Sequence, residues 1–141
     1  MSEESRREAL ERVCREHGVL AAYLFGSRAD DGLRLLVGEE VARQGSDLDV
    51  GIVFPGAGSD LQTLVRLQLG LDGVFEPLRL DVVPLQRVDA LFQARAIDGH
   101  RVFAADSTEA DLYELLVLRR AADLLPLQRA RELELFGIST S

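Results

Sequence analysis

Residues 45–54 read Gly-Ser-Asp-Leu-Asp-Val-Gly-Ile-Val-Phe and place two aspartates at the head of an apolar run. Asp is depleted in β-strands, so Asp47 and Asp49 at the start of a hydrophobic strand need a chemical reason. Side chains two residues apart in a strand share a face, with roots roughly 6–7 Å apart. Two carboxylates at that separation can bind one divalent cation or bridge a pair of cations. The stretch therefore predicts a metal site suited to phosphoryl or nucleotidyl transfer, with a solvated strand end as the alternative.

A second feature lies upstream, where residues 20–25 predict a buried strand that runs directly into Gly26 and Ser27. A Gly-Ser turn after a strand presents backbone N–H groups and a hydroxyl to an anion, and Gly lets the backbone approach a phosphate closely. Arg28 adds a charge that suits phosphate oxygens. These three residues predict a phosphate site, although a Gly-Ser pair alone is also typical of an ordinary turn.

A third feature lies downstream, where residues 78–84 read Leu-Arg-Leu-Asp-Val-Val-Pro. An unpaired carboxylate in a half-buried strand is costly, so Asp81 is expected to meet either a cation or a nearby arginine. If this strand lies beside the strand that follows Asp47, three carboxylates meet at one edge of the sheet. The sequence thus predicts a three-carboxylate site, with a salt bridge of Asp81 as the alternative.

The three segments in this order resemble the nucleotidyltransferase superfamily related to DNA polymerase β. The matching residues are Leu-Phe-Gly-Ser-Arg-Ala at 24–29, Gly-Ser-Asp-Leu-Asp-Val at 45–50 and Leu-Asp-Val-Val at 80–83. Within the superfamily, the chain looks most like the minimal nucleotidyltransferases (MNT). The resemblance implies an α+β, polymerase β-like fold, in which helices pack on a small mixed sheet and a helix ends the chain.

The resemblance also implies roles for the site residues. Asp47 and Asp49 would hold two Mg²⁺ ions, while Asp81 would bind the catalytic ion and accept the proton of an attacking hydroxyl. The triphosphate of ATP or another NTP would be held next to them. The nucleotide-binding residues expected from the pattern are Gly26, Ser27, Arg28, Gly45 and Ser46.

MNT proteins look like antitoxins that place AMP on a tyrosine of a HEPN-type ribonuclease toxin. By this resemblance we expect AMPylation of such a partner, bound through the C-terminal helix or the active-site face. Two alternatives stay open: a non-catalytic, nucleotide-binding antitoxin that acts by contact, and a transferase for small molecules such as aminoglycosides. A chain of 141 residues leaves little room for the larger helical domain of the small-molecule enzymes.

The chain departs from the family pattern between the Gly-Ser turn and the aspartate pair. Ser27 and Asp47 are 20 positions apart, about twice the spacing that is usual in the family. The additional residues, around 30–44, would either lengthen the helix after Ser27 or add a loop over the site. No motif residue is lost through this insertion.

Length and composition favour a small soluble protein. Residues 1–141 are expected to form a single domain, with a core at about 8–105 and a C-terminal helical segment at about 107–136. No apolar run approaches the roughly 20 residues that span a bilayer, and no secretory signal is evident. Cys14 is the only cysteine, so a cytoplasmic location is expected. The net charge of −8, without any lysine, argues against free nucleic-acid binding.

The C-terminal segment predicts a long helix with more apolar surface than a small sheet needs. The residues expected to form a broad apolar face are Leu112, Leu115, Leu116, Leu118 and Leu125. Such a face either packs on the sheet or binds a partner subunit or a second copy. Pro126 is expected to kink this helix or end it near Leu125. In an earlier helix at 61–71, the residues expected to face inward are Leu61, Leu64, Val65, Leu67 and Leu71.

Overall fold

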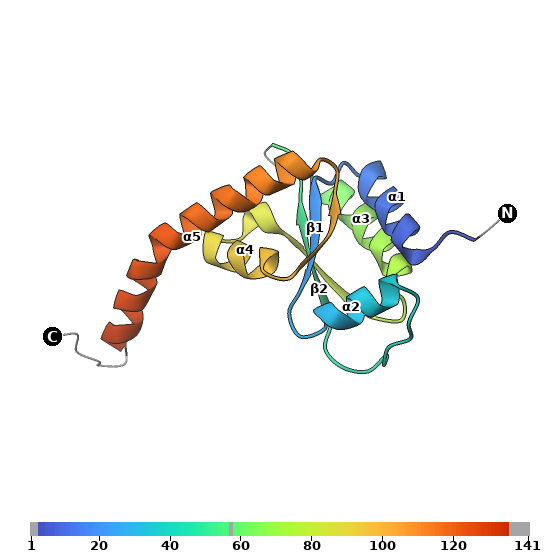
Figure 1. The fold of residues 1–141 in the computed structure, drawn as a ribbon, viewed down its shortest axis with the longest axis horizontal. Coiled ribbons are helices and arrows are strands. Elements are labelled where there is room, and N and C mark those ends of the chain that lie inside the picture. The colour runs from blue at the N-terminus through green and yellow to red at the C-terminus, as the bar shows by residue number, and fades with distance from the viewer. Residues whose placement is uncertain (1–2, 57, 136–141) are drawn as a thin grey trace.

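Helices and strands alternate along most of the chain (Figure 1). The computed structural model describes residues 3–56 and 58–135. The elements are α1 Arg6–Glu16, β1 Ala21–Phe25, α2 Ala29–Leu36, β2 Leu48–Val53, α3 Leu61–Val74, β3 Leu80–Pro84, the single 3₁₀ turn η1 Leu85–Arg87, α4 Ala90–Ile97, β4 His100–Ala104 and α5 Ser107–Leu135.

The four strands form one mixed sheet in the order β3-β2-β1-β4. β1 is antiparallel to β2 and β4, whereas β2 and β3 run parallel. Parallel neighbours need a crossover, and α3 provides it. The predicted α+β fold, with a small mixed sheet, packed helices and a C-terminal helix, is confirmed. β3, which carries Asp81, is an edge strand, so one side of it is open.

Helices cover both faces of the sheet, with α1, α2 and α3 on one side and α4 with the start of α5 on the other (Figure 1). Successive residues of β1 point to opposite faces, and both sets are buried. Leu24 belongs to the core beneath α1 and α3, while Tyr23 belongs to the core beneath α4 and α5. Burial on both faces explains why β1 reads as a continuous apolar run.

Short polar side chains set the starts of three helices. The side chains of Ser5, Asp60 and Asp89 each accept a hydrogen bond from the backbone N–H three residues further on. Each bond satisfies an N–H that the first helical turn leaves without a partner, which stabilises the helix by about 1 kcal/mol. Both Ser59 and Asp60 precede α3, and Asp60 is the residue that caps it.

A polar cluster ties the first half of α5 to the sheet. The hydroxyl of Tyr23, which is fully buried, donates to Glu114 Oε2 at 2.8 Å. Arg101 of β4 donates to the same carboxylate at 2.8 Å and to Asp111 at 2.7 Å. Burial, followed by the bond to Glu114, raises the pKa of Tyr23 far above its usual value. α5 is therefore anchored at its start, and its second half extends beyond the sheet (Figure 1).

Pro126 was expected to kink α5 or to end it, and the helix does not end there. α5 continues through Pro126, and its course bends in the second half (Figure 1). Proline removes one N–H donor, and water can bind the freed carbonyl of Ala122 because this part of α5 is exposed. On α3, Leu61 and Val65 are 71% and 51% exposed instead of facing inward. α3 is apolar on two sides, so periodicity alone could not choose between them. Phe136 lies outside the described residues.

The predicted apolar face of α5 exists and is largely uncovered. All five leucines named for it are 47% exposed or more. The buried apolar residues of α5 are instead Ala110, Val117 and Ala121, and the helix packs mainly against α4. In the part of the chain that the structure describes, no helix is both long enough and apolar enough to cross a membrane.

Candidate active site

Asp49 of β2 lies beside Asp81 of β3. The two strands run parallel in a register that pairs Leu48 with Leu80 and Asp49 with Asp81. Adjacent strands are about 4.8 Å apart and paired residues share a face, so the two carboxylates stand side by side. The register is well specified because Leu48 is fully buried on the opposite face, and a slip of one residue would expose it.

The carboxylates leave negative charge uncompensated. The pKa of Asp49 is raised, first by burial and then by the charges of Asp81 and Asp47. Among the described residues, no arginine forms an ion pair with any of the three. The alternative prediction, a salt bridge between Asp81 and an arginine, is therefore not seen among the described residues.

Gly26 follows β1 and approaches Asp49 closely. Phe25 is the register partner of Asp49, which brings the end of β1 against the carboxylate. Gly26 has a φ of +77°, and a Cβ built on it would lie 2.2 Å from Asp49 Oδ2. A residue with a side chain would thus be strained and would collide with the carboxylate.

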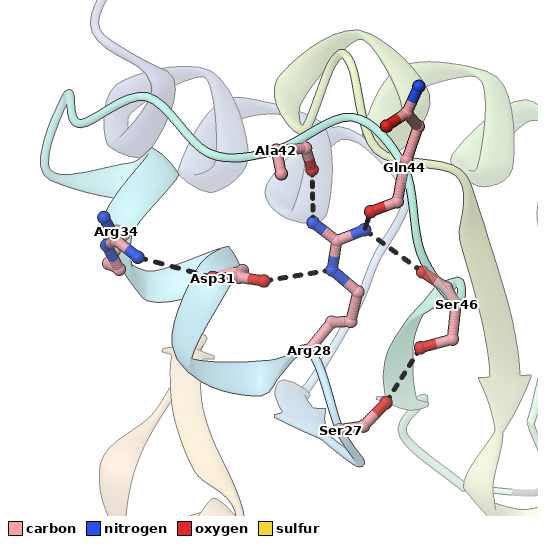
Figure 2. Close-up of polar contacts among 7 residues, drawn as sticks. All are labelled: Ser27, Arg28, Asp31, Arg34, Ala42, Gln44 and Ser46. Carbon is pink, nitrogen blue, oxygen red and sulfur yellow. Dashed lines mark hydrogen bonds and ion pairs between the residues drawn. The ribbon is translucent and has the colours of Figure 1, made fainter.

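Two serines join the turn after β1 to the segment before β2. The hydroxyls of Ser27 and Ser46 are 2.8 Å apart, as Figure 2 shows. Both residues are exposed. The Gly26-Ser27 and Gly45-Ser46 pairs, which are 19 residues apart in the chain, are thereby brought to the same end of the sheet as Asp49.

Arg28 differs from what we expected. Its side chain is only 6% exposed, and it lies at the centre of the contacts in Figure 2. Nε donates to Asp31 at 3.0 Å, and the two terminal nitrogens donate to the backbone carbonyls of Ala42, Gln44 and Ser46. These donors hold a loop in place, and the phosphate contact of Arg28 stays a prediction.

The insertion divides between a helix and a loop. Residues 29–36 form α2, and residues 37–47 return as the loop that Arg28 holds. Gly38 and Gly45 have φ angles of +90° and +133°, which are readily adopted only by glycine. The loop has no regular secondary structure, yet three of its carbonyls are bound by one buried side chain. The loop is therefore held in a defined position next to the site.

The carboxylate oxygens at this site are suitable ligands for a hard cation, but they are not arranged as a complete metal-binding site. Within the described residues, no three His, Cys, Asp or Glu side chains are gathered closely enough to hold a metal ion. Asp49 and Asp81 are neighbours, while Asp47 lines an adjoining pocket. Carboxylate oxygens are the ligands that Mg²⁺ prefers, and their charge is uncompensated. The chemistry of these residues thus suits Mg²⁺.

A pocket of about 500 Å³ adjoins Asp47. It is lined by Arg43, Gln44, Gly45, Ser46, Asp47, Pro77 and Arg79. Arg43 and Arg79 were not among the site residues predicted from the sequence. Arg79 precedes Asp81 by two residues in the same strand region, and this spacing was the available signal. No sequence signal pointed to Arg43, because its position depends on the path of the loop.

The comparison with protein families decides the assignment. A model of the family "Polymerase beta, Nucleotidyltransferase" matches residues 8–108, which is well over half of the chain. The chain belongs to this nucleotidyltransferase family. The matched range contains all three strands that carry site residues, together with the loop held by Arg28. No curated protein matches the sequence.

Solved structures share the fold of this nucleotidyltransferase. A toxin–antitoxin structure with AMP-PNP has a TM-score of 0.69 at 14% identity, over 92% of this chain and 98% of that chain. A tri-AMPylated Shewanella oneidensis HEPN toxin in complex with MNT antitoxin gives 0.66 at 13% identity, over 93% and 96%. A candidate minimal nucleotidyltransferase gives 0.51 at 30% identity, over 67% and 85%. The resemblance to the MNT group is thereby confirmed.

Proposed function

We propose that this nucleotidyltransferase transfers AMP from ATP to a hydroxyl group of a partner protein, a tyrosine of a HEPN-type toxin, and so acts as an antitoxin. The observation that carries the chemistry is the pairing of Asp49 with Asp81 beside a glycine that no other residue could replace without a collision. The acceptor is suggested by similar structures, which include a complex of an AMPylated HEPN toxin with an MNT antitoxin.

The phosphates of ATP are proposed to bind at the turn that follows β1. Gly26 lets the backbone approach the triphosphate, and the hydroxyl of Ser27 donates to a phosphate oxygen. Gly45 and Ser46 lie across from this turn through the 2.8 Å contact between the serine hydroxyls. Arg28 supports the arrangement indirectly, by fixing the loop that carries Ser46.

The three carboxylates are proposed to hold Mg²⁺. Asp47 and Asp49 would hold two ions, with Asp81 as the third carboxylate. When bound, Mg²⁺ neutralises phosphate charge and stabilises the attacking and leaving oxygens. Support comes from the raised pKa of Asp49, which reflects burial and two neighbouring negative charges that a cation would relieve.

The proposed reaction is an in-line displacement at the α-phosphorus. The acceptor oxygen forms a bond to phosphorus, the bond to the β-phosphate oxygen breaks, and pyrophosphate leaves. Asp81 accepts the proton of the attacking hydroxyl. The protein contributes mainly by positioning the two substrates and by organising charge around them.

A labelling assay in host lysate tests this function. Purified protein receives Mg²⁺ and ATP labelled on the α-phosphate, with Asp47→Asn as the inactive variant and the exposed Asp98→Asn as a matched control. We expect one labelled protein band with the wild type and Asp98→Asn, and none with Asp47→Asn. A partner that coprecipitates with all three proteins without any label would instead favour an antitoxin acting by contact. Pyrophosphate release without a labelled band would favour a small-molecule acceptor.

A further inference from the structure

Two arginines line the pocket beside the carboxylates. Arg43 comes from the inserted loop and Arg79 from the residues before β3. Both residues are exposed, and neither forms an ion pair within the described part of the chain. In a protein with a net charge of −8, an open pocket with two such guanidinium groups is a distinct local feature.

The position of Arg43 is fixed by its backbone. The carbonyls on either side of it, those of Ala42 and Gln44, are both bound by Arg28. Arg28 is buried and also forms an ion pair with Asp31 at 3.0 Å. The loop therefore presents Arg43 to the pocket from a held segment, and a preorganised charge binds a ligand with less loss of conformational entropy.

The order of the strands indicates on which side of the reacting phosphorus the pocket lies. Gly26 follows β1, Asp49 lies on the central β2, and Asp81 lies on the edge strand β3. In-line transfer needs the attacking and leaving groups on opposite sides of the α-phosphorus. If pyrophosphate leaves on the side of β1, the acceptor enters on the side of β3, where Arg79 and the pocket lie.

The lining of the pocket favours a short acidic segment. Its volume of about 500 Å³ lies in the range of ordinary ligand sites, and guanidinium groups bind carboxylates through paired hydrogen bonds. Gly45, Ser46 and Asp47 also line it, but these residues are already assigned to the triphosphate and the metal. Arg79 also lines a neighbouring hollow, but Asp72 and Glu76 line that hollow as well and make it less favourable for an anion. The overall negative charge disfavours a long polyanion such as nucleic acid.

We infer that Arg43 and Arg79 bind acidic residues of the acceptor protein that flank the hydroxyl to be modified. The inference rests on the proposed function and adds to it a substrate preference. It also gives the insertion a purpose, because the loop supplies one of the two arginines.

Peptide binding tests the inference without requiring catalysis. Two synthetic peptides each carry one tyrosine, flanked by glutamates in one and by serines in the other. Their affinity for the full chain with Mg²⁺ and AMP-PNP is measured by fluorescence anisotropy. The test variant is Arg43→Gln/Arg79→Gln, and Arg66→Gln/Arg95→Gln removes the same charge from exposed positions elsewhere.

The wild type should bind the glutamate peptide at least about tenfold more tightly than the serine peptide, as expected for one or more charge-assisted hydrogen bonds. Arg43→Gln/Arg79→Gln should lose this preference, and Arg66→Gln/Arg95→Gln should keep it. Equal binding of both peptides by the wild type would overturn the inference, as would an equal loss in the two double variants. A parallel loss of AMP-PNP affinity would also overturn it, because the arginines would then serve the triphosphate.

Transfer to the same peptides separates this inference from the proposed function. If AMP is transferred with the same KM to both peptides, the function stands and the acidic preference fails. If the glutamate peptide is bound selectively but the wild type transfers no AMP, the proposed function fails and the anion site stands.

Discussion

Asp49 and Asp81 are direct register partners across the parallel strands β2 and β3. This pairing brings together two carboxylates that are separated by more than 30 residues in the chain. Like charges placed opposite each other destabilise a sheet, and burial of Asp49 adds to this effect. The site is thus a place where the isolated fold is strained electrostatically and where a cation would relieve the strain.

Asp81→Asn should stabilise the metal-free protein. The pKa of Asp49 is raised in the folded state, so its contribution to stability is fully present below its unfolded pKa and is lost as the pH rises through the folded value. Removing the neighbouring charge should therefore raise the free energy of unfolding at pH 7 by up to about 1 kcal/mol, and by less near pH 4. Urea denaturation in EDTA measures this, with Asp98→Asn as the control. A loss of stability, or a gain that does not depend on pH, would contradict the interpretation.

Gly26→Ala should lower the free energy of unfolding by more than the backbone strain at this position alone would. Both Gly26 and Gly18 have positive φ angles, +77° and +69°. A Cβ at Gly26 would meet Asp49 Oδ2 at 2.2 Å, whereas a Cβ at Gly18 would meet nothing within 4 Å. Gly18→Ala therefore measures the conformational strain alone, which is about 1 kcal/mol. We expect Gly26→Ala to lose more stability and also to lose AMP-PNP binding, as measured by calorimetry. Equal behaviour of the two variants would show that the close approach to Asp49 is unimportant.

Arg28→Met should release the inserted loop. The substitution leaves Asp31 and three backbone carbonyls without their donor, and hydrogen bonds to charged groups contribute about 1.5–3 kcal/mol. We expect a loss of about 2 kcal/mol and faster amide exchange at residues 42–47. Arg34→Met is the matched control, because Arg34 pairs with Asp31 and Glu39 while 55% exposed, and should change stability by less than about 0.5 kcal/mol. Unchanged exchange in Arg28→Met would contradict the role assigned to this residue.

Cys14 should react only when the protein unfolds. The residue is fully buried on α1, and burial raises the pKa of its thiol to about 12. Because this exceeds the value of about 8.5 for a free thiol, its contribution to stability is complete below about pH 8.5 and is lost as the pH rises towards 12. Iodoacetamide labelling at pH 8 should therefore follow the unfolded fraction across a urea titration. Rapid labelling of the folded protein would contradict the packing of α1.

Much of the fold could be predicted from the sequence, because local sequence signals indicate where its helices and strands lie. β1, β2 and β3 read as mainly apolar runs, and Asp60 and Gly99 lie where helices begin or end. The three aspartates and the Gly-Ser turn could be found because each violates a local preference. Their meeting in space could not be derived, since it depends on strand order and register.

Other features depend on tertiary contacts. Arg28 looked like a phosphate ligand, yet the loop of residues 37–47 surrounds its guanidinium, and no local pattern marks that path. The exposed sides of α3 and α5 are as apolar as their buried sides, so periodicity misplaced Leu61 and Val65. Pro126 was expected to divide α5 or bend it, and an exposed helix can continue through a proline when water binds the freed carbonyl.

The most direct test of nucleotidyl transfer compares the fates of two phosphates. Host lysate receives the purified protein, Mg²⁺, and ATP labelled either on the α- or on the γ-phosphate, with Asp49→Asn in parallel. We predict that, compared with lysate alone, the wild type adds α-label to a protein, adds no γ-label to protein and releases the γ-label in pyrophosphate, and that Asp49→Asn does neither. Protein γ-labelling above that of lysate alone, or α-labelling that persists in Asp49→Asn, would contradict the proposal that the Asp49–Asp81 pair performs nucleotidyl transfer.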